Sequence, residues 1–136
     1  MALKRLKIDS DADAFVIAIS CHQKSIKFAW EINRALKCEL QATQEYPDNI
    51  YFIQELDGHA YFNWTNPSEK FTLHLISNHG EKSLLVPTQK QIDYFMVVTG
   101  FYEELDFEDA LKKIKQIESV LTAFPVTLDK VKTKLT

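Results

Sequence analysis

Apolar residues in the first third of the chain change from a continuous run to a helical spacing. Residues 14–20 are apolar and rich in β-branched side chains, and the length and composition of this run predict a buried strand. Ser25 is then suited to cap a helix that ends at Leu36. The apolar positions of that helix are Phe28, Ala29, Ile32, Ala35 and Leu36. We therefore predict a strand followed by an amphipathic helix over residues 25–36.

The dipeptide Asp57-Gly58 separates two strongly apolar segments, residues 50–56 and 59–64. It is a strong indication of a two-residue hairpin turn, which would place Ile53 opposite Phe62. One face of the hairpin then carries Tyr51, Ile53, Ala60, Phe62 and Trp64, and the other carries Ile50, Phe52, Leu56 and Tyr61. A sheet with one wet face alternates apolar and polar residues. Because both faces here are apolar, the hairpin is covered either on both sides within one protomer or on one side by a partner.

The centre of the chain continues in strand-like patterns. Residues 71–75 alternate between apolar and polar side chains, and residues 83–86 are a further short strand. Together with the hairpin they predict a meander of about four antiparallel strands. Residues 92–99 are almost continuously apolar, which is typical of a central strand covered on both faces.

The C-terminal third predicts a second helix and a last strand. Asp106 is a suitable N-cap, with Asp109 three residues on. The apolar stripe of this helix consists of Phe107, Ala110, Leu111, Ile114 and Ile117. A strand follows at residues 120–126, so a crossover should make it parallel to residues 92–99. The whole chain, residues 1–136, thus predicts one α+β domain: an antiparallel-rich mixed sheet of about five to seven strands, with two main helices packed on one face.

Composition and charge narrow the choice of partner and compartment. The chain has 136 residues, a formal net charge of −3 and 46% hydrophobic residues, which are ordinary values for a globular domain. Duplex nucleic acid is not expected as a partner, because it is bound through an excess of basic surface. No stretch approaches the roughly 20 apolar residues that cross a bilayer, and no signal peptide is evident. We expect a cytoplasmic protein with no membrane partner and with Cys21 and Cys38 reduced.

Residue patterns for catalysis or metal binding are scarce. Three glycines cannot build a phosphate loop or a nucleophile elbow, and no Cys-x-x-Cys or His-Glu-x-x-His sequence occurs. Cys21 and His22 are adjacent, and a distant set with His79 stays open as a metal site. We predict no catalytic residue, no metal and no cofactor. The candidate pocket, between the sheet and the first helix, consists of Cys21, His22, Trp30, Asp93 and Tyr94.

The stretch from Val86 through Pro87 and Thr88 to Ile92-Asp93-Tyr94 resembles the signature of the IPExxxVDY family. This is an uncharacterised family of small cytoplasmic proteins from Bacteroidetes-type bacteria. Val86, Thr88 and Ile92 depart from the usual Ile, Glu and Val, and Thr88 lacks the carboxylate of the usual residue. The resemblance implies a lineage and a compartment but no reaction. From the residues themselves, we expect Asp93 to cap backbone amides and the Tyr94 hydroxyl to need a buried partner.

Two functions of different kinds follow from the sequence. The first is a non-catalytic interaction domain, which we expect to form a homodimer with Ile50, Phe52, Leu56 and Tyr61 as the contact surface; an unknown protein partner is also compatible. The alternative is a small enzyme or small-molecule-binding protein that uses the pocket near Cys21, His22 and Trp30. Single-stranded RNA binding by sheet aromatics is a third possibility, against which the acidic balance argues. We choose the first.

Overall fold

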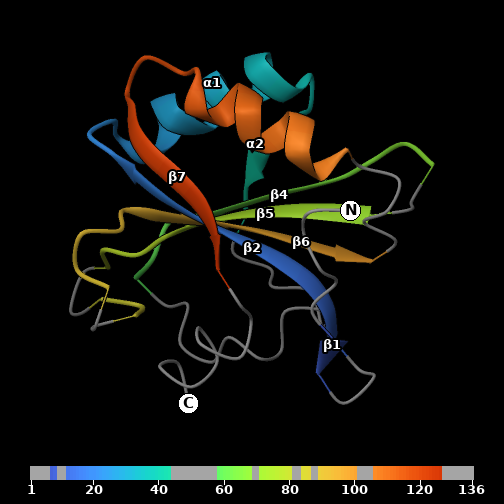
Figure 1. The fold of residues 1–136 in the computed structure, drawn as a ribbon, viewed down its shortest axis with the longest axis horizontal. Helices are drawn as coiled ribbons and strands as arrows, with labels where there is room; N and C mark the ends of the chain where they lie inside the picture. Colours follow the sequence, from blue (N-terminus) through green and yellow to red (C-terminus); the bar gives the residue numbers. More distant parts are fainter. Residues whose placement is uncertain are drawn as a thin grey trace.

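The computed structural model describes residues 7–8, 12–43, 58–68, 71–80, 84–86, 89–100 and 106–126. In chain order, the strands and helices are β1 (Lys7–Ile8), β2 (Ala12–Cys21), α1 (Ser25–Leu36), β3 (Gln41–Ala42), β4 (Tyr61–Thr65), β5 (Phe71–Ser77), β6 (Tyr94–Gly100), α2 (Phe107–Lys115) and β7 (Val120–Val126). Both helices lie on the same side of the sheet (Figure 1). The predicted α+β class, with one antiparallel-rich sheet and two helices, is confirmed.

The strands form one seven-stranded sheet in the order β1-β2-β6-β5-β4-β3, and β7 also pairs with β2. Every described pairing is antiparallel. Because β6 and β7 are both antiparallel to β2, they run parallel to each other with β2 between them. The predicted parallel relation of the last two strands is thus confirmed. The strand between them, β2, is the one predicted at residues 14–20.

Several predicted boundaries need correction. Ser25 is the first residue of α1 and not its cap; the N-cap is Lys24, whose side chain makes no capping hydrogen bond. Asp106, in contrast, caps α2 as predicted, because its carboxylate accepts a hydrogen bond from the Asp109 amide. Residues 84–86 are not a strand; Leu84 makes only an isolated bridge to His79.

The predicted register of the hairpin at Asp57-Gly58 is wrong. Phe62 has Ala42 of β3 on one side and Leu75 of β5 on the other, so no edge of its backbone is left for Ile53. Gly58 has a positive φ of 85°, a conformation that favours glycine. Residues 50–56, the first half of the predicted hairpin, lie outside the described residues.

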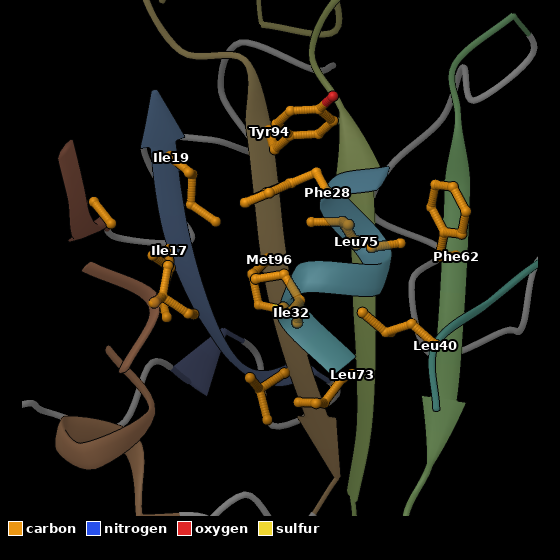
Figure 2. Close-up of a cluster of buried hydrophobic side chains, with 14 of the residues drawn as sticks. Ile17, Ile19, Phe28, Ile32, Leu40, Phe62, Leu73, Leu75, Tyr94 and Met96 are labelled. Atoms are coloured by element: carbon orange, nitrogen blue, oxygen red, sulfur yellow. The ribbon is translucent and has the colours of Figure 1, made fainter. Parts of the chain in front are cut away.

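The main core lies between the helices and the sheet. Phe28 and Ile32 of α1 are fully buried and point onto the strands that carry Ile17, Leu75 and Met96 (Figure 2). The second helix buries Phe107, Ala110 and Ile114. Its first residue stacks on Phe15 of β2, with 4.3 Å between the ring centroids. The apolar side of each amphipathic helix therefore packs onto the sheet, as expected.

The opposite face of the sheet is also buried within the single protomer. Successive side chains of a strand point to opposite faces, so this second face carries the residues that alternate with the core residues. They are Val16, Ala18, Tyr61, His74, Ile76, Phe95, Val97 and Thr99, each at most 3% exposed. The sequence left open whether the second face of the hairpin is covered within the protomer or by a partner. At Tyr61 it is covered within the protomer.

Candidate functional site

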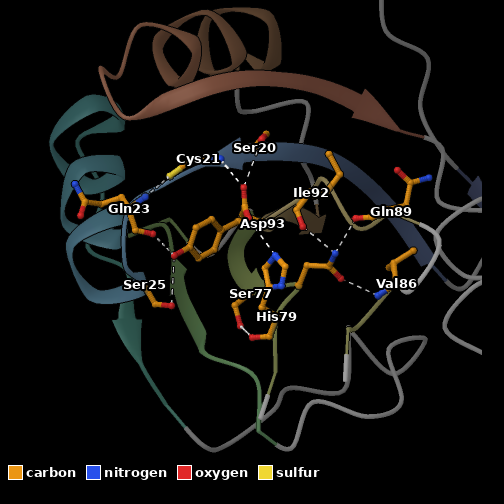
Figure 3. A network of polar contacts seen from close by, with 12 residues as sticks. Ser20, Cys21, Gln23, Ser25, Ser77, His79, Val86, Gln89, Ile92 and Asp93 are labelled. Carbon is orange, nitrogen blue, oxygen red and sulfur yellow. Dashed lines mark hydrogen bonds and ion pairs between the residues drawn. The ribbon is translucent and has the colours of Figure 1, made fainter. Parts of the chain in front are cut away.

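A cluster of polar contacts lies where β2 ends and β6 begins, and Asp93 is at its centre (Figure 3). One carboxylate oxygen, Oδ2, accepts a hydrogen bond of 2.8 Å from the Cys21 amide and faces the Ser20 hydroxyl at 3.4 Å. The other oxygen, Oδ1, lies 3.0 Å from Nε2 of His79, which follows β5. Asp93 thus caps a backbone amide, as expected, and joins the ends of three strands.

Tyr94, the first residue of β6, ties the same corner to the first helix. Its ring packs against Phe28 of α1 with 4.7 Å between centroids. Its hydroxyl donates to the Gln23 carbonyl at 2.5 Å and lies 3.5 Å from the Ser25 hydroxyl. Burial raises the pKa of this phenol above its ordinary value. The hydroxyl is therefore a neutral donor that holds the chain between β2 and α1.

Asn78 organises the segment that precedes Asp93. It is fully buried, and its side-chain amide donates to the carbonyls of Gln89 and Ile92 at 3.0 and 2.8 Å. Its side-chain oxygen accepts from the Val86 amide at 2.7 Å. In the sequence, Asn78 precedes His79 and Gly80, a composition typical of a turn. Asparagine is common in turns. The sequence does not show that the side chain of this asparagine binds residues up to 14 positions further along the chain.

The Cys21 thiol is turned inward and is not activated. Cys21 is 3% exposed, its sulfur accepts from the Gln23 amide at 3.3 Å, and it lies 3.9 Å from the Ser119 hydroxyl. Burial raises the thiol pKa, and the nearby carboxylates of Asp93 and Glu31 raise it further. A nucleophilic cysteine needs the opposite environment, one that favours the thiolate.

The predicted pocket residues separate into two groups. Cys21, Asp93 and Tyr94 belong to the polar corner described above. His22 is exposed. Trp30 is 52% exposed on the outer side of α1, where the Arg34 guanidinium lies 4.8 Å from the centre of its ring. The structure therefore brings three of the five residues together and places the other two toward solvent.

A second polar group, which the sequence did not predict, crosses the opposite face of the sheet. His74 of β5 is fully buried between Tyr61 of β4 and Thr99 of β6. Its Nδ1 lies 2.7 Å from the tyrosine hydroxyl and its Nε2 lies 2.9 Å from the threonine hydroxyl. Burial lowers the pKa of His74 from 6.5 to about 3. The imidazole is therefore neutral at physiological pH and serves as a link between hydroxyl groups.

Neither polar group has the composition of a metal centre. Among the residues that the structure describes, no group of three or more His, Cys, Asp and Glu side chains could hold a metal ion. The His79–Asp93 pair stands at the surface, with 53% and 28% of the two side chains exposed. The two polar groups chiefly stabilise the fold, because most of their hydrogen bonds go to backbone atoms or to other buried side chains.

Among the described residues, four large apolar side chains are exposed. Ile26 is 80% exposed and Trp30 is 52% exposed, both on α1; Leu121 is 61% exposed and Phe124 is 37% exposed, both on β7. Across the part of the chain that is described, β7 pairs only with β2. Of the predicted contact residues, Tyr61 is 3% exposed, while Ile50, Phe52 and Leu56 lie outside the described residues.

Comparison with known proteins gave no relative: no family model, no curated protein and no solved structure matches this chain. Within the described residues, neither helix has the length and apolar character to cross a lipid bilayer.

Proposed function

We propose that this protein is a non-catalytic, cytoplasmic interaction domain that self-associates, and that β7 supplies the contact. The observation that carries the proposal is the exposure of Leu121 (61%) and Phe124 (37%) on a strand that has one described neighbour. Natural proteins protect such strands, because an open edge with apolar side chains pairs readily with another chain. A second copy is the simplest cover, since a two-fold axis beside β7 lets one edge serve both protomers.

The sequence of β7 supports a short, specific contact. Pro125 has no amide hydrogen to donate, so it limits how far strand pairing can extend toward the C-terminal end of β7. Leu121 lies where the register between β2 and β7 shifts, at the step from Ser20 to Cys21. The contact would therefore centre on residues 121–124. The contact predicted from Ile50, Phe52 and Leu56 stays a prediction, and Tyr61 is too deeply buried to take part in it.

Sedimentation velocity at micromolar concentrations tests the proposal. We expect the unmodified protein to sediment as a dimer and the Leu121→Asp and Phe124→Asp variants as monomers with an unchanged circular dichroism spectrum. Trp30→Asp is the matched control, because it removes an equally exposed apolar side chain from the helix layer and should leave the dimer intact. A monomeric unmodified protein would refute self-association, and a dimer broken only by Phe52→Asp would move the contact to the predicted hairpin.

The alternative of a small enzyme or ligand-binding protein near Cys21, His22 and Trp30 has less support. Its nucleophile would be a buried thiol with a raised pKa, and two of its residues face solvent. The proposed membership of the IPExxxVDY family rests on the spacing of Pro87, Asp93 and Tyr94, of which the last two hold the corner between β2, β6 and α1. In that view, the signature describes a structural joint and not a reaction centre.

A further inference from the structure

The outer side of α1 carries a continuous basic and apolar stripe. Ile26, Trp30 and Arg34 follow one another at helical spacing, Lys27 lies beside them, and Lys37 is the C-cap of the helix; we call these five residues the α1 stripe. All five are exposed, whereas Phe28, Ala29 and Ile32 on the other side of the helix are buried. Side chains three or four positions apart on a helix are surface neighbours. The stripe therefore presents two apolar side chains bordered by three cations.

The first turn of α1 lacks the capping and acidic side chains that stabilise the N-terminal end of α2. The N-terminal end of a helix is electropositive and favours carboxylates. The first turn of α2 has Glu108 and Asp109, and basic residues occupy its last turn. The first turn of α1 contains no acidic residue, and its N-cap, Lys24, makes no side-chain capping bond. Ile26, 80% exposed, lies in the same turn.

No contact within the described part of the protomer explains why the first turn of α1 lacks an acidic residue and a side-chain cap and exposes Ile26. A sequence that breaks local rules without an evident structural gain marks a candidate functional position. Glu31, the one carboxylate on α1, accepts a hydrogen bond of 2.8 Å from the Ser119 hydroxyl, next to β7. This carboxylate is therefore held toward Ser119, and the three cations of the stripe outnumber the single negative charge of the helix.

Arg34 and Trp30 hold each other in place within the stripe. The guanidinium lies 4.8 Å from the centre of the indole ring, which is the distance of a cation–π contact. Such a pair presents the planar donors of arginine from a fixed position, and these donors match the two oxygens of a carboxylate. Tryptophan and arginine are also the residues most enriched among those that dominate binding energy at protein interfaces.

We infer that the α1 stripe binds an acidic protein segment that also carries apolar side chains. Charge complementarity carries the inference: three cations gather on one side of a protein whose net charge is −3. The apolar side chains of the segment would cover Ile26 and Trp30, and its carboxylates would face Lys27, Arg34 and Lys37. This surface lies on α1, apart from β7, so the inference does not depend on the proposed self-association.

Two other occupants fit the stripe less well. Single-stranded nucleic acid would stack on Trp30, but it would leave the most exposed apolar residue, Ile26, without a partner. An anionic lipid surface would attract the cations, but this attraction does not require an arginine that is held in a fixed position over an indole ring. Both occupants are distinguishable outcomes of the experiment below.

The probe is a library of random peptides displayed on phage and selected on the unmodified protein. We expect the selected peptides to combine Asp or Glu with Leu, Ile or Phe. Fluorescence anisotropy of a labelled selected peptide should show affinity about tenfold weaker for Trp30→Ala and for Lys27→Glu. Binding should also weaken when the salt concentration rises from about 0.1 M to about 1 M. All variants alter exposed side chains and should keep the circular dichroism spectrum of the unmodified protein.

Matched controls keep the inference falsifiable. Leu121→Asp removes an exposed apolar side chain from β7, and Lys112→Glu reverses an exposed charge on α2; neither should change peptide affinity. Selected peptides that are basic or lack acidic residues, or affinities that the stripe variants leave unchanged, would overturn the inference. So would binding to polyuridylate or to phosphatidylglycerol vesicles by the unmodified protein with no selectable peptide. Because Leu121→Asp affects only self-association, failure of one proposal can be told from failure of the other.

Discussion

The carboxylate of Asp93 accepts a 2.8 Å hydrogen bond from the backbone amide of Cys21, so the residue before β6 fixes the last residue of β2. The two residues are 72 positions apart in the chain. The contact is part of a joint that also includes His79 and the Ser20 hydroxyl. This joint sets where β2 stops and where the chain turns toward α1.

Replacing Asp93 with alanine should destabilise the protein more than removing its surface partner does. Asp93→Ala leaves the Cys21 amide without its acceptor, which costs about 1–3 kcal/mol when the amide is buried. His79→Ala removes only the exposed side of the contact and should cost about 1 kcal/mol or less. Urea unfolding of the two variants checks this order. Equal losses would mean that the carboxylate does not support the Cys21 amide.

Asn78 is expected to be the most sensitive polar residue of the described fold. Asn78→Ala removes three hydrogen bonds and takes their side-chain partner from the Val86 amide and the Ile92 carbonyl, while the Gln89 carbonyl still accepts from the Ile92 amide; we therefore expect a loss of about 3 kcal/mol. Asn78→Asp keeps the acceptor for Val86 but replaces the two donors with a buried carboxylate oxygen that faces two carbonyls, so we expect a loss at least as large. Thermal unfolding followed by circular dichroism is the measurement. Gln116→Ala, at an exposed position after α2, is the control and should change stability by less than about 0.5 kcal/mol.

His74 should make the protein less stable as the pH falls. Its pKa is lowered from 6.5 to about 3 by burial, so the unfolded chain binds a proton that the folded protein excludes. From about pH 6.5 downward to about pH 3, this histidine should reduce the free energy of unfolding by up to about 1.4 kcal/mol per pH unit, and above that range it contributes no slope.

Urea unfolding at several pH values measures this effect. His74→Gln should show a shallower fall in stability below pH 6.5 than the unmodified protein. Thr99→Val is the control: it removes a hydrogen-bond partner of His74 but keeps the imidazole, so it should lower stability while keeping the steeper pH dependence. Identical pH dependence in the unmodified protein and His74→Gln would show that His74 titrates alike in both states.

Both cysteines should react slowly with thiol reagents in the folded protein. Burial raises the pKa of Cys38 to about 11 and raises that of Cys21 as well, so the reactive thiolate is scarce at neutral pH. We expect labelling by a disulfide reagent to be at least about tenfold faster in urea than in buffer, because access requires local opening. Rapid labelling of Cys21 in the folded protein would instead favour the enzyme alternative.

The elements with a clear local period could be predicted from the sequence. The stripes of Phe28 and Ile32 in α1 and of Phe107 and Ile114 in α2 place both helices and their buried faces. The apolar run at residues 92–99 correctly indicates a central strand. These signals are local, since each depends on side chains within one or two turns or along one strand.

The parts that could not be predicted depend on contacts distant in the chain. Residues 38–46 have an extended pattern that includes Gln41–Ala42, but no local signal shows that this strand occupies the edge of Phe62 that the hairpin was expected to use. The candidate site divides in the same way. Asp93 and Tyr94 could be assigned capping and anchoring roles, but their partners Cys21 and Gln23 lie some 70 residues earlier. The burial of His74 depends on neighbours in β4 and β6 that no single segment shows.

The position of β2 between β6 and β7 has a consequence for how the protein is made. Ile17 is flanked by Met96 on one side and by Pro125 on the other, so β2 meets its two long neighbours, β6 and β7, only after most of the chain exists. A ribosome therefore releases β2 long before the two strands that flank it, β6 and β7. Pairings between such distant segments form slowly, and the nascent chain is open to aggregation in that interval. A chain that stops before β7 would leave residues 16–21 of β2 without the strand that now pairs with them on one side.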